Sequence, residues 1–195
     1  MRDGAFWRGY LVPRRAMALR LGERAGPRGT DARAHLYLFA ACAIGALATL
    51  PEAMRNGSTF DPEARGGVVP AHLFAYLFVA PLIAYVTAAA LHLAARGFGG
   101  RARFAEARMA LFWSLLLGAP IALAVTALEL AAPIPATRLV VLAASASWLW
   151  LLAANLAEAE GFGTTARVAA VLIGALALIV VSLNALTGGE LLAHV

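Results

Sequence analysis

Two histidines are the residues of this sequence whose type and position best suit cofactor binding. His35 stands where the first long apolar stretch begins, and His92 stands near the end of the second. If both stretches cross a membrane in opposite directions, the two imidazoles lie at the same depth and could bind a haem b iron. The alternative is that both rings contact head groups or backbone carbonyls at the membrane boundary. Because the paired-histidine pattern of haem-binding helix bundles is incomplete, we expect no bound cofactor.

A carboxylate and two prolines form a second set of candidates. Glu129 ends the third apolar stretch, and ionisable residues within a membrane often belong to ion or proton pathways. The alternative is an interfacial carboxylate, because Pro133 follows four residues later. Pro81 and Pro120 each remove a backbone hydrogen bond and are expected to kink their helices. Since transporters contain broken helices, these three residues would matter most if the protein is a small transporter or channel component.

Motifs of common enzyme active sites are absent from the sequence. It contains no GxSxG, HExxH, Walker, CxxC or GxGxxG pattern. The single cysteine, Cys42, lies inside an apolar stretch, so no disulfide framework or cysteine-based metal centre is available. We therefore expect no enzymatic activity, no catalytic residues and no metal site.

The elements that must position these residues are five apolar stretches of about bilayer length. A helix needs about 20 apolar residues to cross the hydrocarbon layer, and continuous runs exclude a β-barrel, whose strands alternate. The bulk composition agrees, with 62% apolar and 14% charged residues, because soluble domains have about 25% charged residues. The sequence predicts an all-α, polytopic membrane protein with five spans, at residues 36–54, 68–95, 109–128, 139–157 and 168–187.

The positions of the arginines predict the orientation of these spans. All 16 basic residues are arginines, and 13 of them lie before the first span or in the second and fourth loops. Basic residues are retained on the cytoplasmic side, which places the N-terminus inside and, after five crossings, the C-terminus outside. This distribution also argues against nucleic acid as the partner of a chain with a formal charge of +5. The absence of lysine, with much alanine and glycine, indicates a GC-rich bacterial genome and hence the bacterial cytoplasmic membrane.

Residues 1–34 are expected to form a cytoplasmic basic arm, followed by the membrane domain at 35–195. Aromatic and basic residues recur at helical spacing in the arm, which is typical of a helix at the head-group boundary. We expect this helix to be held on the anionic inner leaflet by Trp7, Arg8, Arg14, Arg15 and Arg20, with residues 22–33 as a flexible linker. A partner-binding arm is the alternative.

Several short motifs resemble those of the Yip family of five-span membrane proteins, in the short form found in alphaproteobacteria. They are residues 13–17 (PRRAM), 31–37 (DARAHLY), 50–51 (LP), 78–82 (FVAPL), 92–96 (HLAAR) and 107–116 (ARMALFWSLL). The resemblance covers about residues 8–190. It implies five helices, a cytoplasmic N-terminus and no known chemistry.

Eukaryotic members of the Yip family reside in early secretory membranes and interact with Rab-type GTPases. Their cytosolic Asp-Leu-Tyr-Gly-Pro motif is missing from this sequence, so that partner is not transferred. We expect instead a non-enzymatic protein that organises the membrane or binds other membrane proteins or itself. One variant of this hypothesis is an accessory subunit of a larger membrane complex. A small transporter or channel component remains the alternative.

Overall fold

The structure is a computed structural model that describes residues 5–22, 27–131 and 137–186. The described residues form helices and turns, without a strand. In chain order the helices are α1 (Ala5–Leu11), α2 (Pro13–Gly22), α3 (Pro27–Gly57), α4 (Pro62–Arg65), α5 (Val68–Phe74), the π-helix η1 (Ala75–Val79), α6 (Ala80–Gly97), α7 (Phe104–Ala131), α8 (Thr137–Glu160) and α9 (Thr165–Leu186). The predicted all-α fold is confirmed.

Four helical segments of the described chain are long and apolar enough to cross a membrane. They are Asp31–Gly57, Glu63–Gly97, Phe104–Ala131 and Leu139–Glu160. Each contains one of the first four predicted spans. The fifth predicted span lies in α9, whose apolar stretch among the described residues, Thr165–Ala175, is shorter. The structure therefore confirms a helical, multi-pass architecture, and a fifth crossing stays a prediction.

The first membrane helix begins earlier than the sequence suggested. Helix α3 begins at Pro27, a residue that suits the first helical turn, so residues 27–33 are helical although they were expected to be linker. Asp31 in this segment forms an ion pair with Arg108 of α7. A polar helical turn outside the lipid carries no apolar signal, which explains why the sequence did not reveal it.

The second span contains a change of helix type at a proline. The five residues of η1 form a π-helix directly before α6, in which Pro81 occupies the first turn. Proline lacks an N–H and its ring crowds the carbonyl four residues earlier, and a π-turn is one way to accommodate both effects. In α7, by contrast, Pro120 lies inside a helix that continues to Ala131.

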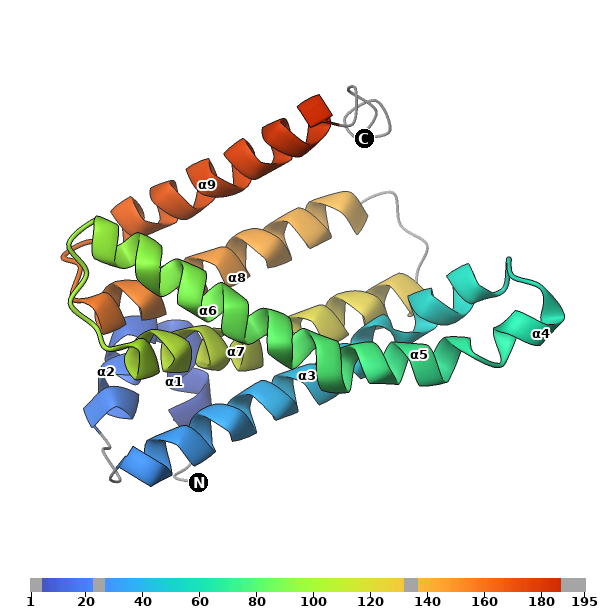
Figure 1. The fold of residues 1–195 in the computed structure, drawn as a ribbon, viewed down its shortest axis with the longest axis horizontal. Helices are drawn as coiled ribbons and strands as arrows, with labels where there is room; N and C mark the ends of the chain where they lie inside the picture. Colours follow the sequence, from blue (N-terminus) through green and yellow to red (C-terminus); the bar gives the residue numbers. More distant parts are fainter. Residues whose placement is uncertain (1–4, 23–26, 132–136, 187–195) are drawn as a thin grey trace.

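The buried core lies at one end of the bundle, where α2, α3, α7 and α8 meet (Figure 1). Its largest fully buried side chains are Trp113, Phe112, Leu117, Met17 and Leu38. We call this the arm end, because α1 and α2 lie there together with the turns that join α6 to α7 and α8 to α9. At the opposite end, which we call the far end, α7, α8 and α9 spread apart in Figure 1. There the apolar side chains are mostly exposed, as Leu139 and Leu142 show at 71% and 64%.

Candidate functional site at the arm end

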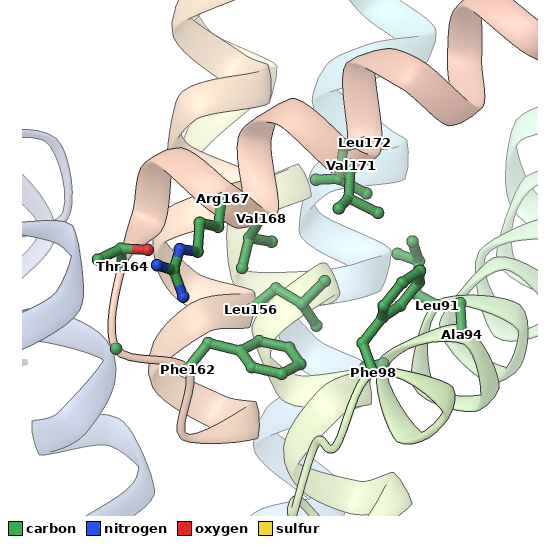
Figure 2. A pocket seen from close by; sticks show the side chains of 12 residues that line it. Leu91, Ala94, Phe98, Leu156, Phe162, Thr164, Arg167, Val168, Val171 and Leu172 are labelled. Carbon is green, nitrogen blue, oxygen red and sulfur yellow. The ribbon is translucent and has the colours of Figure 1, made fainter.

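A cavity of about 400 Å³ opens at the arm end between α6, α8 and α9 (Figure 2). Leu91 and Phe98 line it on the α6 side, and Leu156 and Val168 line it from α8 and α9. Arg167 is the one charged side chain of the lining and Thr164 adds a hydroxyl, while the other lining side chains are apolar. An apolar cavity with a few polar groups is typical of small-molecule sites.

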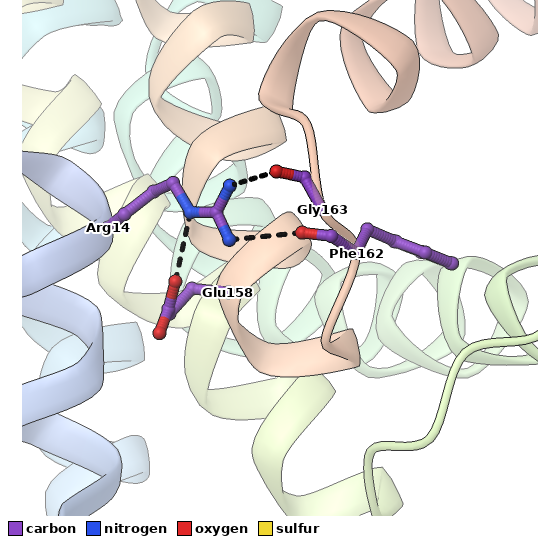
Figure 3. Close-up of polar contacts among 4 residues, drawn as sticks. All are labelled: Arg14, Glu158, Phe162 and Gly163. Carbon is purple, nitrogen blue, oxygen red and sulfur yellow. Dashed lines mark hydrogen bonds and ion pairs between the residues drawn. The ribbon is translucent and has the colours of Figure 1, made fainter.

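The turn that forms one rim of the cavity is held by the N-terminal arm (Figure 3). Arg14 of α2 donates from Nη1 to the carbonyl of Gly163 at 3.0 Å and from Nη2 to that of Phe162 at 3.0 Å. Its Nε donates to the Glu158 carboxylate at 2.9 Å. A planar guanidinium with several donors suits this three-way contact, whereas lysine could not reproduce the geometry.

The arm makes further contacts with α7. The Tyr10 hydroxyl donates to the carbonyl of Leu117 at 2.6 Å. Leu117 directly follows the residue whose carbonyl has no helical N–H donor, because Pro120 lacks an N–H. Burial raises the pKa of the Tyr10 hydroxyl. The guanidinium of Arg20 lies 4.7 Å from the centre of the Trp113 ring, a cation–π contact. The arm is therefore packed on the bundle.

The five predicted anchor residues fall into two groups in the structure. Trp7, Arg8 and Arg15 are exposed, with Trp7 at 69%, and so are free to contact head groups. Arg14 and Arg20 contact the bundle through the interactions above. The role of the arm at a membrane surface stays a prediction, and the aromatic spacing that predicted a helix could not show which face packs on protein.

A buried carboxylate joins the turn after α6 to the end of α8. Glu160 is fully buried, and its Oε1 lies 3.0 Å from His92 Nδ1 while its Oε2 accepts from the backbone N–H of Ala102 at 3.1 Å. Its backbone carbonyl accepts from the N–H of Arg101 at 3.1 Å. Gly100 must lack a side chain here, because a Cβ would lie 2.5 Å from Glu160 Oε2. Sequence reasoning missed this contact, since Glu160 reads as an ordinary loop carboxylate.

The two histidines proposed as a haem pair lie in different hydrogen-bond networks. His92 contacts Glu160, whereas His35 Nδ1 lies 2.6 Å from the Asp31 carbonyl and its Nε2 lies 2.7 Å from the Tyr85 hydroxyl. Haem binding through Nε2 would require His35 to give up the Tyr85 hydroxyl, whereas the Glu160 contact of His92 uses Nδ1. No group of three or more metal-binding side chains occurs in the part of the chain that the structure describes.

The candidates in the second and third spans lie apart from this site. Glu129 is partly buried near the end of α7, toward the far end. The buried polar contacts of α7 lie elsewhere, where Asn155 donates to the Ser114 hydroxyl at 2.9 Å and Trp148 donates to the Ser114 carbonyl at 3.1 Å. These contacts join α7 to α8. They indicate a packing role, because each contact joins two neighbouring helices in the core; the Oδ1 atom of Asn155 has no hydrogen-bond partner among the described residues.

Four long apolar helical segments among the described residues define this protein as a multi-pass helical membrane protein. The chain belongs to the Yip1 domain family, whose domain matches residues 12–186. The family resemblance inferred from the short motifs is thus confirmed. Neither the curated proteins nor the solved structures compared with the chain give a significant match.

Proposed function

We propose that this protein is a non-enzymatic organiser of the cytoplasmic membrane of a bacterium, which binds other membrane proteins or further copies of itself. Membership of the Yip1 domain family supports a membrane protein of this kind. The arginine distribution supports an N-terminus in the cytoplasm and a C-terminus outside, with α9 as the fifth crossing. An accessory subunit of a larger complex is one form of this role.

The observation that carries the proposal is the weak burial of the second span. Only 11% of the most apolar part of Glu63–Gly97 is buried, compared with 33% to 39% in the other three membrane segments. Phe74 and Phe78 stack on each other with ring centres 5.0 Å apart, and they are 59% and 64% exposed. A rigid, exposed aromatic pair is a suitable contact for another helix, since aromatic residues provide much contact area at low entropic cost.

Small residues on α8 support the same proposal. Ala143 and Ser147 are spaced four residues apart and are exposed toward the far end. Small residues at this spacing let helices approach closely in lipid, where association depends on packing rather than on the hydrophobic effect. In contrast, the small residues Ala41 and Gly45 of α3 pack inside the bundle, where Gly45 faces the Tyr76 ring.

The proposal is tested by affinity purification in native nanodiscs. Wild-type protein should recover a stable partner or a homo-oligomer, and the double variant Phe74→Ala, Phe78→Ala should lose it. Phe39→Ala is the matched control, because Phe39 is an exposed phenylalanine on another span at 47% exposure, and it should retain the partner. A wild-type protein that is strictly monomeric and partner-free would contradict the proposal.

A further inference from the structure

We propose that the cavity between α6, α8 and α9 binds one anionic phospholipid, with an acyl chain among the apolar side chains and the phosphate on Arg167. The cavity volume of about 400 Å³ lies within the roughly 300–1,000 Å³ range of small-molecule sites. The proposal requires only that the chain lies in a membrane, and it does not depend on the partner-binding role.

The position of the charge favours an anion. Arg167 is exposed in the first turns of α9 and makes no ion pair or hydrogen bond with another described residue. The nearby carboxylates are already engaged, because Glu158 binds Arg14 and Glu160 binds His92 and the Ala102 N–H. Among the described residues the guanidinium at the mouth of the cavity therefore has no counter-ion, and a phosphate matches its planar array of donors.

The geometry of the cavity favours a lipid over a soluble anion. Figure 2 shows Arg167 and Thr164 near the start of α9, with Val171 and Leu172 further along the helix and Phe98 and Leu91 across the cavity. The cavity is polar at its mouth, near the ends of the spans, and apolar further along the helices. A phospholipid in its leaflet likewise has its polar head group at the surface and its apolar acyl chains inside the membrane. The positive end of the helix dipole at the start of α9 adds to the attraction for an anion.

The selectivity of the site should come from the head group. An acyl chain gains little hydrophobic free energy by moving from bilayer to cavity, because lipid tails are as apolar as the lining. Both kinds of lipid carry the phosphate that Arg167 would contact, so the distinction comes from the net charge of the head group: the cation of a zwitterionic head group offsets the attraction of Arg167 for the phosphate. Loss of one basic residue near the surface is expected to reduce this preference about fivefold.

Arg14 positions one rim of this site. Its guanidinium holds the carbonyls of Phe162 and Gly163, and both residues line the cavity. The arm and the lipid site are thereby coupled: release of Arg14 from the turn should change how tightly the lipid is held, without removing the charge that selects it.

Native mass spectrometry of the purified full-length protein, equilibrated with equal amounts of phosphatidylglycerol and phosphatidylcholine, tests the site. Wild-type protein should retain one phosphatidylglycerol. Arg167→Gln should lower the ratio of retained phosphatidylglycerol to phosphatidylcholine about fivefold. Arg103→Gln is the control, because Arg103 is an exposed arginine that pairs with Glu106 and does not line the cavity, and it should behave like wild type.

A second variant separates the cavity from general surface charge. Leu172→Trp should fill the cavity and abolish retention of both lipids. Equal phosphatidylglycerol retention by wild type and Arg167→Gln would overturn the proposal, as would retention that survives Leu172→Trp. A dimer that is present in wild type and lost in Leu172→Trp would show that a second copy occupies the cavity instead. Because this assay measures lipid retention and leaves Phe74 and Phe78 intact, whereas the nanodisc assay measures recovery of a partner or a homo-oligomer, failure of one is distinguishable from failure of the other.

Discussion

Replacement of Glu160 by alanine removes a fully buried carboxylate that joins the end of α8 to α6 and to the turn after it. The substitution leaves His92 Nδ1 and the Ala102 N–H without their acceptor, at sites where the present distances are 3.0 and 3.1 Å. A buried donor left without its acceptor typically costs about 1–3 kcal/mol, so the loss of both acceptors should cost at least about 2 kcal/mol. For a chain of 150–250 residues each kcal/mol lowers the melting temperature by about 2–4 °C, so Glu160→Ala should unfold at least about 4 °C below wild type.

The assay uses the single cysteine as its probe. Cys42 is buried at 8% exposure, so a thiol-reactive fluorogenic dye reports unfolding in detergent during a temperature ramp. Glu160→Gln keeps the shape and one acceptor and should lose less than half as much stability as the alanine variant. Glu158→Ala is the matched control, because that carboxylate is 28% exposed and a partly exposed pair contributes about 0–1 kcal/mol. Wild-type melting of Glu160→Ala, or an equal loss in the control, would refute the reasoning.

Three further predictions concern close contacts at the arm end. Gly100→Ala should destabilise the protein by about 1–3 kcal/mol, because the new Cβ would lie 2.5 Å from the carboxylate oxygen of Glu160. Gly97→Ala is the control: the space around Gly97 is open, so this variant should melt at or above the wild-type temperature. Gly118→Ala should displace the Trp148 ring, which a Cβ would meet at 2.3 Å, and a tryptophan emission spectrum identical to wild type would count against this packing. The Tyr10 hydrogen bond should stabilise the docked arm fully below a pH of about 10. This stabilisation should be lost as the pH rises through the raised pKa of Tyr10, because a phenolate cannot donate, and proteolysis of the wild-type arm should then become faster. In Tyr10→Phe, proteolysis of the arm should be faster than in wild type below this pH range and should not increase further across it.

The sequence predicted the membrane helices because lipid imposes a local rule: each span must satisfy its own backbone and present apolar side chains continuously. The contacts of the arm end follow from no such rule. Arg14 and Glu158 are 144 positions apart, and His92 and Glu160 are 68 apart. Each of these residues alone is typical of a membrane boundary.

For the N-terminal arm, the sequence predicted the helices but not what they pack against. Its aromatic and basic residues predicted a helix, and α1 and α2 are helical. An apolar helix face is equally compatible with lipid and with protein, however, so the complete burial of Met17 was not foreseeable. The cavity was equally hidden, because Phe98, Leu156 and Val168 come from three separate elements.

The central claim, that the arm end faces the cytoplasm and the far end faces outward, is tested most directly by cysteine labelling in intact cells. In a Cys42→Ala background, Gly97→Cys reports on the arm end, where a side chain meets open space, and Ser58→Cys reports on an exposed turn at the other end of α3. A membrane-impermeant maleimide should label Ser58→Cys in intact cells and Gly97→Cys only after permeabilisation. The opposite pattern, or labelling of both positions in intact cells, would contradict the account.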